Sequence, residues 1–304
     1  MKKDEWPLSV TFKNIEFPTR FMVAGGMIKT LDQSRKLIRA GVMHELGSIN
    51  TAGSSGNGGR DYYAEYEPGP TPSLSTNVLL ATYNSVGLTN PGMAYTERDA
   101  DEYIALCASR GLPAWLNVSG NGVDDSISLL KRGLKAGFKV ITVNGACPNK
   151  PGQPIICNDV EATDEFFDRA DKEIGETDSV VLWKVSCAMQ PRNLSHNRQR
   201  MRTSRTIDGV ITGNTEPDSL MYRQDGSTAI KTANGITRGG KAGPAIHGTA
   251  LSHTAYMAED LPQGKIVVGA GGARNVRTVV NFIRAGATLV QCASAWRESG
   301  QDVD

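Results

Sequence analysis

Short apolar runs rich in β-branched residues alternate along the chain with longer segments of helical periodicity, and this alternation constrains the fold most. The runs are continuously apolar, as is typical of parallel strands covered by helices outside and packed side chains inside. Eight alternations favour one closed (β/α)8 barrel, a TIM barrel, as a single domain over residues 1–304, with a doubly wound open sheet as the alternative. Strands are expected at residues 20–24, 41–46, 113–118, 139–144, 179–186, 208–212, 265–270 and 288–293, and helices at residues 101–109, 124–136, 161–174 and 276–285.

Three segments stand outside the alternation. Residues 9–17 are expected to form an N-terminal hairpin that closes the floor of the barrel. Residues 51–81 are rich in Gly, Ser, Pro and Tyr, and residues 215–244 contain Asp-Gly and Asn-Gly turn signals. Both are too long for plain connectors, and in a barrel both would rise from the C-terminal face, where active sites are built.

Charge and cysteine content argue against several classes of protein. Lys and Arg number 33 against 32 Asp and Glu, so no net field favours nucleic acid or an anionic membrane as a partner. Five scattered cysteines argue against a disulfide framework and for a reducing, cytoplasmic compartment. The four histidines show no ligand spacing, so no metal is expected, and the N-terminus lacks the apolar run of a signal peptide or membrane span.

Small-residue turns follow the last two expected strands. Gly271-Gly272 and Ser294-Ala295 would each present backbone N–H groups at the start of a helix, where a phosphate binds well. In a (β/α)8 barrel this is the usual phosphate site. Either turn alone would be an ordinary connection, and the pair at adjacent strands favours a bound phosphate.

Four asparagines lie near strand ends or in the loops that follow them. A carboxamide offers a donor and an acceptor in one plane, which matches the adjacent N–H and C=O of an imide or cyclic urea. Each asparagine alone would pass as a turn or capping residue. Gathered on one rim, they predict a site for a flat polar ring: Asn84, Asn144, Asn149 and Asn214.

A thiol and an amine are the candidate reactive groups. Cys147 follows the fourth expected strand, between Ala146 and Pro148, whereas Cys107, Cys187 and Cys292 fit buried structural thiols better. A thiol on the rim can act as a nucleophile or as a general acid and base. Lys184 lies within an apolar strand, where a lysine is costly unless it faces an anionic partner. A barrel lyase or aldolase that uses Lys184 as a Schiff base is the alternative.

These residues lie in motifs that resemble one family, the class 1 dihydroorotate dehydrogenases, and within it the fumarate-using 1A branch. The resemblance extends from about Phe12 to Trp296. Its most specific motif is Asn-Gly-Ala-Cys-Pro-Asn-Lys-Pro-Gly-Gln-Pro, at residues 144–154. Further matching stretches are residues 84–92, 239–251 and 268–272.

The resemblance implies a TIM barrel that carries FMN and oxidises a dihydropyrimidine ring. Cys147 matches the family's base, which removes a C5 proton while hydride passes from C6 to flavin N5. The four asparagines and Thr215 match ring-binding residues, and the backbone amides of Val86, Gly87 and Leu88 match those that receive the substrate carboxylate. Branch members are cytosolic homodimers that pass electrons to fumarate. The residues that match flavin contacts are Ala24, Gly25, Asn117, Lys184, Gly240, Gly271, Gly272 and Ser294.

The sequence departs from the family pattern in the site itself. The family places a lysine at the end of strand two, near flavin and substrate carboxylate, and Leu46 stands at that position. His44 and Glu45 are the candidates to take over part of its role. Relatives also have a hydrophobic residue and serine before the cysteine, and continue with a helical region beyond Trp296. A specialised paralogue acting on another small cyclic amide or imide therefore stays open, as does one that binds FMN or a ring ligand without turnover.

Overall fold

Eight parallel strands close into a barrel in the computed structural model, which describes residues 7–67, 78–147 and 155–300. Because β3 pairs with both β16 and β4, the sheet has no open edge, which confirms the (β/α)8 barrel and rejects the open sheet. Each expected strand is present. They are β3 (Phe21–Ile28), β4 (His44–Ile49), β8 (Trp115–Val118), β9 (Val140–Asn144), β10 (Val180–Lys184), β11 (Gly209–Ile211), β15 (Ile266–Ala270) and β16 (Leu289–Cys292).

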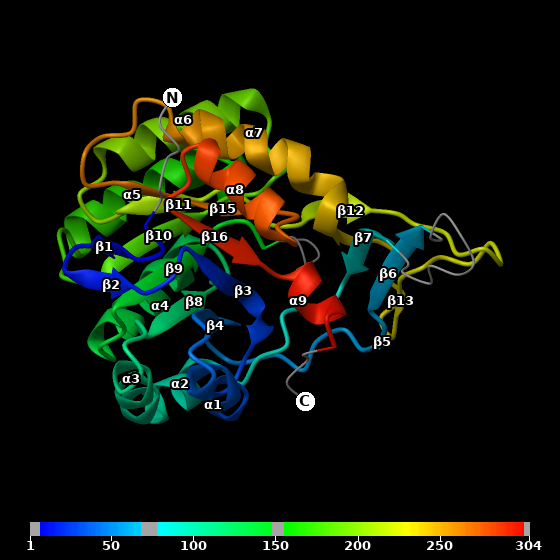
Figure 1. Cartoon of the computed structure of the whole chain (residues 1–304), viewed down its shortest axis with the longest axis horizontal. Helices are drawn as coiled ribbons and strands as arrows, with labels where there is room; N and C mark the ends of the chain where they lie inside the picture. The colour runs from blue at the N-terminus through cyan, green and yellow to red at the C-terminus, as the bar shows by residue number, and fades with distance from the viewer. Residues whose placement is uncertain (1–6, 68–77, 148–154, 301–304) are drawn as a thin grey trace.

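Helices cover most of the outside of the barrel (Figure 1). The four that periodicity predicted, α3, α4, α5 and α8, end within one residue of their expected bounds. In α4, apolar residues such as Ile127 and Leu130 are buried while Asp124 and Lys131 face solvent. Among the residues described, no helix is long and apolar enough to cross a membrane. The helices are α1 (Leu31–Arg39), α2 (Met93–Arg98), α3 (Ala100–Ala108), α4 (Val123–Lys135), α5 (Val160–Glu173), α6 (Pro191–Thr203), α7 (His247–Ala258), α8 (Val276–Arg284) and α9 (Ser294–Glu298), with 3-10 turns η1 (Ile156–Asn158) and η2 (Gly243–Ile246).

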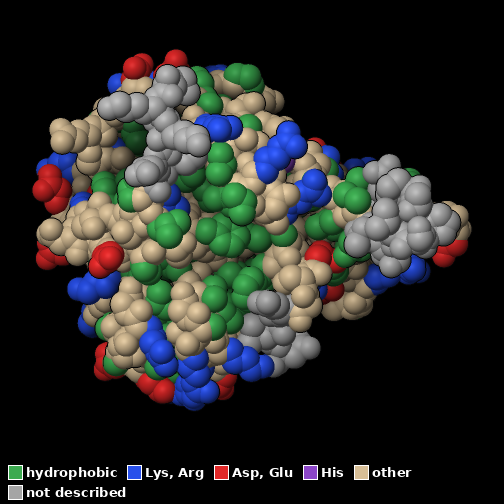
Figure 2. All heavy atoms as spheres, in the orientation of Figure 1, with side chains coloured by type: hydrophobic (Ala, Val, Ile, Leu, Met, Phe, Trp, Pro, Cys, Tyr) green, Lys and Arg blue, Asp and Glu red, His purple; other side chains and the backbone are tan. Residues whose placement is uncertain are grey.

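One side of the barrel wall has little helix in front of it. The strands β3 and β16 face the viewer in Figure 1, and Figure 2 shows hydrophobic side chains gathered over that part of the surface. Phe21, the first residue of β3, is 37% exposed. Lys, Arg, Asp and Glu side chains are interspersed around the same face, as the near-zero net charge predicts (Figure 2).

The two long insertions pair with each other beyond the C-terminal ends of the barrel strands (Figure 1). The first contributes β5 (Gly59–Arg60), β6 (Tyr62–Glu67) and β7 (Val78–Asn84), and the second β12 (Glu216–Ser219), β13 (Lys231–Thr232) and β14 (Gly239–Ala242). Strands β12, β14, β7 and β6 form an antiparallel sheet. The predicted hairpin in residues 215–244 is confirmed, and the sheet that joins both insertions positions several site residues.

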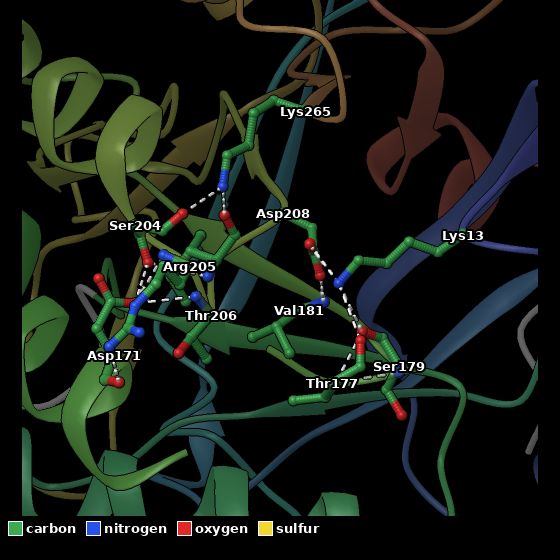
Figure 3. A network of polar contacts seen from close by, with 11 residues as sticks. Lys13, Asp171, Thr177, Ser179, Val181, Ser204, Arg205, Thr206, Asp208 and Lys265 are labelled. Carbon is green, nitrogen blue, oxygen red and sulfur yellow. Dashed lines mark hydrogen bonds and ion pairs between the residues drawn. The ribbon is translucent and has the colours of Figure 1, made fainter. Parts of the chain in front are cut away.

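The N-terminal hairpin, β1 (Val10–Phe12) and β2 (Ile15–Phe17), forms as expected, and its turn ties down the barrel floor. Lys13 pairs with Asp208 at 2.6 Å and donates to the carbonyl of Thr177 at 3.1 Å (Figure 3). The Asp208 carboxylate in turn accepts from the Val181 amide of β10 at 2.8 Å. These contacts lie at the N-terminal ends of the strands, so they stabilise the barrel without touching its opposite face.

A second floor contact centres on Asp171 of α5 (Figure 3). Its carboxylate accepts from the Ser204 hydroxyl at 2.6 Å and from the Arg205 and Thr206 amides at 2.9 Å each. Burial opposes the charge, but these hydrogen bonds together outweigh it, so the pKa of Asp171 is lowered. The carboxylate therefore fixes the loop that leads from α6 into β11.

We expect Asp171→Asn to lower the free energy of unfolding by about 1–2 kcal/mol at pH 7, because a neutral amide accepts these hydrogen bonds less strongly than a carboxylate does. The loss should not be larger, because solvent partly screens the site. Since the folded-state pKa lies below the unfolded value of about 4, the wild-type advantage is present above that pH and disappears as pH falls through the folded pKa. Denaturant midpoints at pH 7 and at low pH measure this. Asp168→Asn, which removes an exposed pair with Arg200, is the control and should change stability little.

Candidate functional site

A cleft opens at the C-terminal ends of the barrel strands. Counting the side open to solvent, the space between its walls is about 610 Å³. Its walls come from β3, β10, β15 and β16, from the loops after β11, β15 and β16, and from the segment 242–246 at the end of the second insertion. Many residues that the sequence singled out line it: Ala24, Gly25, Lys184, Asn214, Thr215, Gly271, Gly272 and Ser294.

The Gly271-Gly272 turn forms one end of the cleft. Gly271 has φ 123° and Gly272 φ 75°, and a Cβ at Gly272 would lie 2.7 Å from the Gly243 carbonyl oxygen, so side chains are excluded at both. The helix that follows begins only at Val276, so the expectation that the two glycines open it is wrong; they form the turn before it. Ser294 does open α9, as expected, and Arg274 adds a cation to the lining. The result is a backbone-lined pocket suited to an anion.

Lys184 stands in the cleft wall with a buried carboxylate nearby. It ends β10 and is 5% exposed. Glu45 of β4 accepts from the Gly25 amide at 2.7 Å, from Asn117 Nδ2 at 3.0 Å and from the Thr142 hydroxyl at 2.6 Å. Burial lowers the pKa of Lys184, while the charges of Glu45 and Cys147 favour its protonated form. The lysine therefore shares the barrel interior with a buried carboxylate whose charge favours its protonated form, which lowers the cost of its place in an apolar strand.

Cys147 lies on a turn that is tied to its neighbours by hydrogen bonds. Asn214 Nδ2 donates to the Ala146 carbonyl at 2.6 Å and to Asn144 Oδ1 at 3.1 Å. The Gly145 amide donates to the Lys184 carbonyl at 3.1 Å. Two of the predicted ring-binding amides and the predicted base are thus held together beside the lysine, whereas Asn149 lies outside the described residues.

The five cysteines differ in their surroundings. Cys147 is partly exposed, and the other four are buried. Burial raises the pKa of Cys107, Cys157 and Cys187 to about 12, so these thiols stay protonated at neutral pH. The prediction that Cys107, Cys187 and Cys292 are buried structural thiols is confirmed.

The insertion sheet brings Asn84, Gly240 and Thr215 together. Asn84, the last residue of β7, lies opposite Gly240 of β14 and donates from Nδ2 to its carbonyl at 3.4 Å. A Cβ at Gly240 would lie 2.1 Å from Thr215 Oγ1, so only glycine allows this approach. The sheet therefore delivers a third predicted amide to the same end of the barrel.

The loop after β7 carries Val86, Gly87 and Leu88. Its carbonyls are engaged by the first insertion: the Asn57 amide donates to Val86 at 3.0 Å and the Ser54 hydroxyl to Gly87 at 2.9 Å. Gly87 has φ 77° and Leu88 φ 56°, so the loop has a fixed, unusual course. Whether its amides receive a carboxylate stays a prediction.

Three buried polar atoms at or near the cleft have no hydrogen-bond partner among the described residues: Asn117 Oδ1, Thr215 Oγ1 and Gln291 Oε1. Buried polar atoms are almost always paired in folded proteins. Thr215 and Gln291 line the cleft, so a ligand with hydrogen-bonding groups would complete them. Gln291 was missed by sequence reasoning because a glutamine inside an apolar strand gave no motif.

Leu46, which stands where the resemblance leads us to expect a lysine, is packed in the core. Leu46 is 4% exposed and lies opposite Ile28 of β3. His44 points away from the cleft, because its ring contacts Ser34 of α1 at 3.1 Å and packs edge-on against Tyr103 of α3. Of the two suggested substitutes, only Glu45 belongs to the site.

Lys29 is a lysine near the barrel rim that the sequence analysis did not single out. It follows the last residue of β3, and burial lowers its pKa to about 8, with the charge of Cys147 opposing this shift and that of Lys184 adding to it. The available signal was its position directly after a barrel strand, where active-site residues gather. It lines a small cavity with Leu46, Tyr95 and Tyr103, apart from the cleft that Lys184 lines.

The family model and two relatives that match this chain carry the name of dihydroorotate dehydrogenase. The family model for dihydroorotate dehydrogenase matches residues 7–303. The chain is 26% identical over 303 residues to "Dihydroorotate dehydrogenase A (fumarate)" of Lactococcus lactis subsp. lactis (strain IL1403), covering 96% of this chain and 89% of that protein. It is 25% identical over 322 residues to "Dihydroorotate dehydrogenase (fumarate)" of Lachancea kluyveri, covering 97% and 89%.

Proposed function

The chain belongs to the dihydroorotate dehydrogenase family, whose members are oxidoreductases acting on CH–CH groups, and from that premise we propose an FMN-dependent enzyme that oxidises a dihydroorotate-like ring with Cys147 as its acid/base. The observation that carries the proposal is the place of Lys184. It lines the cleft, and the charges of Glu45 and Cys147 both act on its amine. The candidate base, a buried lysine and a cleft thus lie at the same end of the barrel, the face on which barrel enzymes carry their active sites.

The cleft fits FMN by the chemistry of its lining. The Gly271-Gly272 turn and Ser294 would hold the phosphate through backbone N–H groups, with Arg274 nearby. Gly25 and Lys184 would face the ring system. The Thr215 hydroxyl could donate to a ring carbonyl, and Gln291 Oε1 could accept from a ring N–H. Bound there, the flavin supplies the acceptor for the hydride that leaves the substrate. The remaining proposed contacts are Ala24, Asn117 and Gly240.

The chain's own residues would manage the substrate and its proton. Asn84, Asn144, Asn149 and Asn214 would hold the ring by its N–H and C=O edges, with Thr215 beside them. Cys147 Sγ would accept the proton from the ring carbon adjacent to the one that is oxidised. Asn214 also fixes the turn that carries this thiol, so ring position and base position depend on the same side chain. The amides of Val86, Gly87 and Leu88 would receive the carboxylate.

Anaerobic mixing of the purified yellow protein with dihydroorotate tests the proposal. We expect the flavin absorbance to bleach, and dihydrouracil, which lacks the carboxylate, to bleach it far more slowly. Fast bleaching by dihydrouracil alone would favour a paralogue for a neutral cyclic amide, which the apolar Leu46 would suit. Absence of bleaching with both rings would favour a non-catalytic binder, and borohydride trapping of an imine at Lys184 would favour the Schiff-base alternative.

The proposed electron acceptor, compartment and oligomeric state rest on the likeness to the relatives. We propose that fumarate is the electron acceptor, since both relatives carry it in their names. We also propose a cytoplasmic homodimer in which each chain, residues 1–304, is one flavin-binding unit. Fumarate-dependent reoxidation of the reduced flavin and the mass of the protein in solution measure these two points.

A further inference from the structure

The Gly271-Gly272 turn, where the proposed phosphate would bind, has a backbone that is easily reoriented. Both glycines line the cleft, and both have positive φ, at 123° and 75°. The peptide between two glycines has no Cβ on either side to oppose its rotation, so its carbonyl and amide can exchange sides at little cost. A phosphate site made of backbone N–H groups therefore depends on a further group that fixes the direction of this peptide.

The side chain of His247 contacts this turn without lining the cleft. Its Nδ1 lies 3.2 Å from the carbonyl oxygen of Gly271, and a Cβ on Gly272 would lie 2.8 Å from the Cβ of His247. Because a carbonyl oxygen can only accept a hydrogen bond, Nδ1 is the donor and carries the ring proton. The described residues that line the cleft include both glycines but not the histidine, so His247 lies behind the turn.

The geometry of a trans peptide turns this contact into a constraint on the neighbouring amide. In such a peptide the carbonyl oxygen and the amide hydrogen point in opposite directions. Since His247 binds the Gly271 carbonyl, the Gly272 N–H of the same peptide points away from His247. Within the described part of the chain, no residue accepts a hydrogen bond from the Gly272 amide.

We infer that His247 is a positioning residue for the flavin phosphate, which fixes the Gly271-Gly272 peptide so that the Gly272 N–H faces the cleft as a phosphate donor. The inference rests on the proposed function for the identity of the ligand. The contact between the imidazole and the Gly271 carbonyl does not depend on that proposal.

The imidazole ring is itself held in place by the helices that cover this side of the barrel. His247 is the first residue of α7, and its ring packs edge-on against Phe282 of α8 with the ring centroids 5.1 Å apart. Phe282 is fully buried, and a Cβ on Gly269 of β15 would lie 2.5 Å from its ring. Helix α7 packs on β15 and α8 on β16 (Figure 1). The barrel wall therefore sets the position of the donor.

The other ring nitrogen does not compete with this contact. His247 Nε2 is buried and has no hydrogen-bond partner among the residues that the structure describes. The bond to Gly271 is thus the polar contact that sets the orientation of the ring. A histidine that served packing alone would affect the binding of every flavin equally, whereas one that directs an N–H group to the phosphate affects only a flavin that carries a phosphate.

The test compares two flavins that differ in the phosphate. Full-length protein freed of bound flavin is titrated with FMN and with riboflavin, which has the same ring system and no phosphate, and quenching of flavin fluorescence gives both dissociation constants. We expect His247→Phe to weaken FMN binding about tenfold and to leave riboflavin binding within about twofold of the wild type, because a hydrogen bond to a charged group is lost. Phenylalanine keeps a ring against Phe282 and lacks the donor. His247→Asn should recover most of the FMN affinity, because its Nδ2 can take the place of the ring Nδ1.

His196→Phe is the matched control, since it removes a histidine of α6 that pairs with Asp164 and should change neither constant. An unchanged FMN affinity in His247→Phe overturns the inference, and so does an equal loss for both flavins, which would indicate packing. A His247→Asn variant as weak as His247→Phe overturns it as well, because the donor would then not matter. Selective loss of FMN in a protein whose flavin no ring reduces would keep the inference and remove the proposed reaction, whereas a wild type that binds neither flavin would remove both.

Discussion

Replacing Cys147 by serine is expected to slow reduction of the bound flavin by dihydroorotate about 10²–10⁴-fold at pH 7, with flavin content unchanged. The hydroxyl of serine is far less acidic than a thiol, so it cannot accept a ring proton at this pH without a further base. The turn itself should keep its shape, because its hydrogen bonds run through Asn144, Ala146 and Asn214 and not through the sulfur. Anaerobic stopped-flow absorbance of the flavin measures the rate.

Cys107→Ala is the matched control. That thiol is 1% exposed in α3, and burial raises its pKa to about 12, so it takes no part in proton transfer. Its loss should leave the reduction rate within about twofold of the wild type, since it holds no place in the site. A serine variant of Cys147 that reduces its flavin at the wild-type rate would falsify the role proposed for the sulfur.

The barrel and much of its rim could be predicted from sequence, because both depend on local signals. Continuous apolar runs located the strands, and the residues directly after them had to meet on one face. Gly25, Lys184, Asn214 and Gly271 were found in this way, and all four line the cleft. In a parallel barrel, a residue that directly follows a strand lies on the C-terminal face, so its place in the sequence is enough to predict its place in the fold.

The long-range pairings could not be predicted in the same way. Nothing local indicates that β7 of one insertion pairs with β14 of the other, which is how Asn84 comes to lie opposite Gly240. The sequence also does not show which of His44 and Glu45 faces into the barrel. Side chains alternate along a strand, so one of the two must face inward. In the structure Glu45 faces into the barrel and His44 faces the helices. Lys29 was missed because β3 continues to Ile28, past the expected end at residue 24.

Leu46 departs from the family motif that the sequence resembles, and no local signal in the sequence showed what would surround it. The structure places Leu46 opposite Ile28 of β3 and leaves it 4% exposed, so this position is part of the packed core.

Lys184→Met is expected to have the largest effect on the folded protein. Glu45 is buried and would lose the nearby buried cation that offsets its charge, and a buried charge left without compensation costs a few kcal/mol. We expect lower thermal stability and loss of most bound flavin, measured by a melting curve and by the absorbance of the protein after desalting. Lys131→Met, which removes an exposed pair with Glu173, is the control and should cost about 1 kcal/mol at most.

The double variant Lys184→Met/Glu45→Gln separates electrostatics from packing. A neutral amide at position 45 can accept from the Gly25 amide through its oxygen and donate from its nitrogen to the Thr142 hydroxyl oxygen, so the barrel interior stays hydrogen-bonded while the unpaired charge is removed. We expect most of the lost stability to return and flavin reduction to remain impaired, because the cation is still missing. If the double variant were as unstable as Lys184→Met, the lysine would act through its aliphatic packing, and the electrostatic account of the site would be wrong.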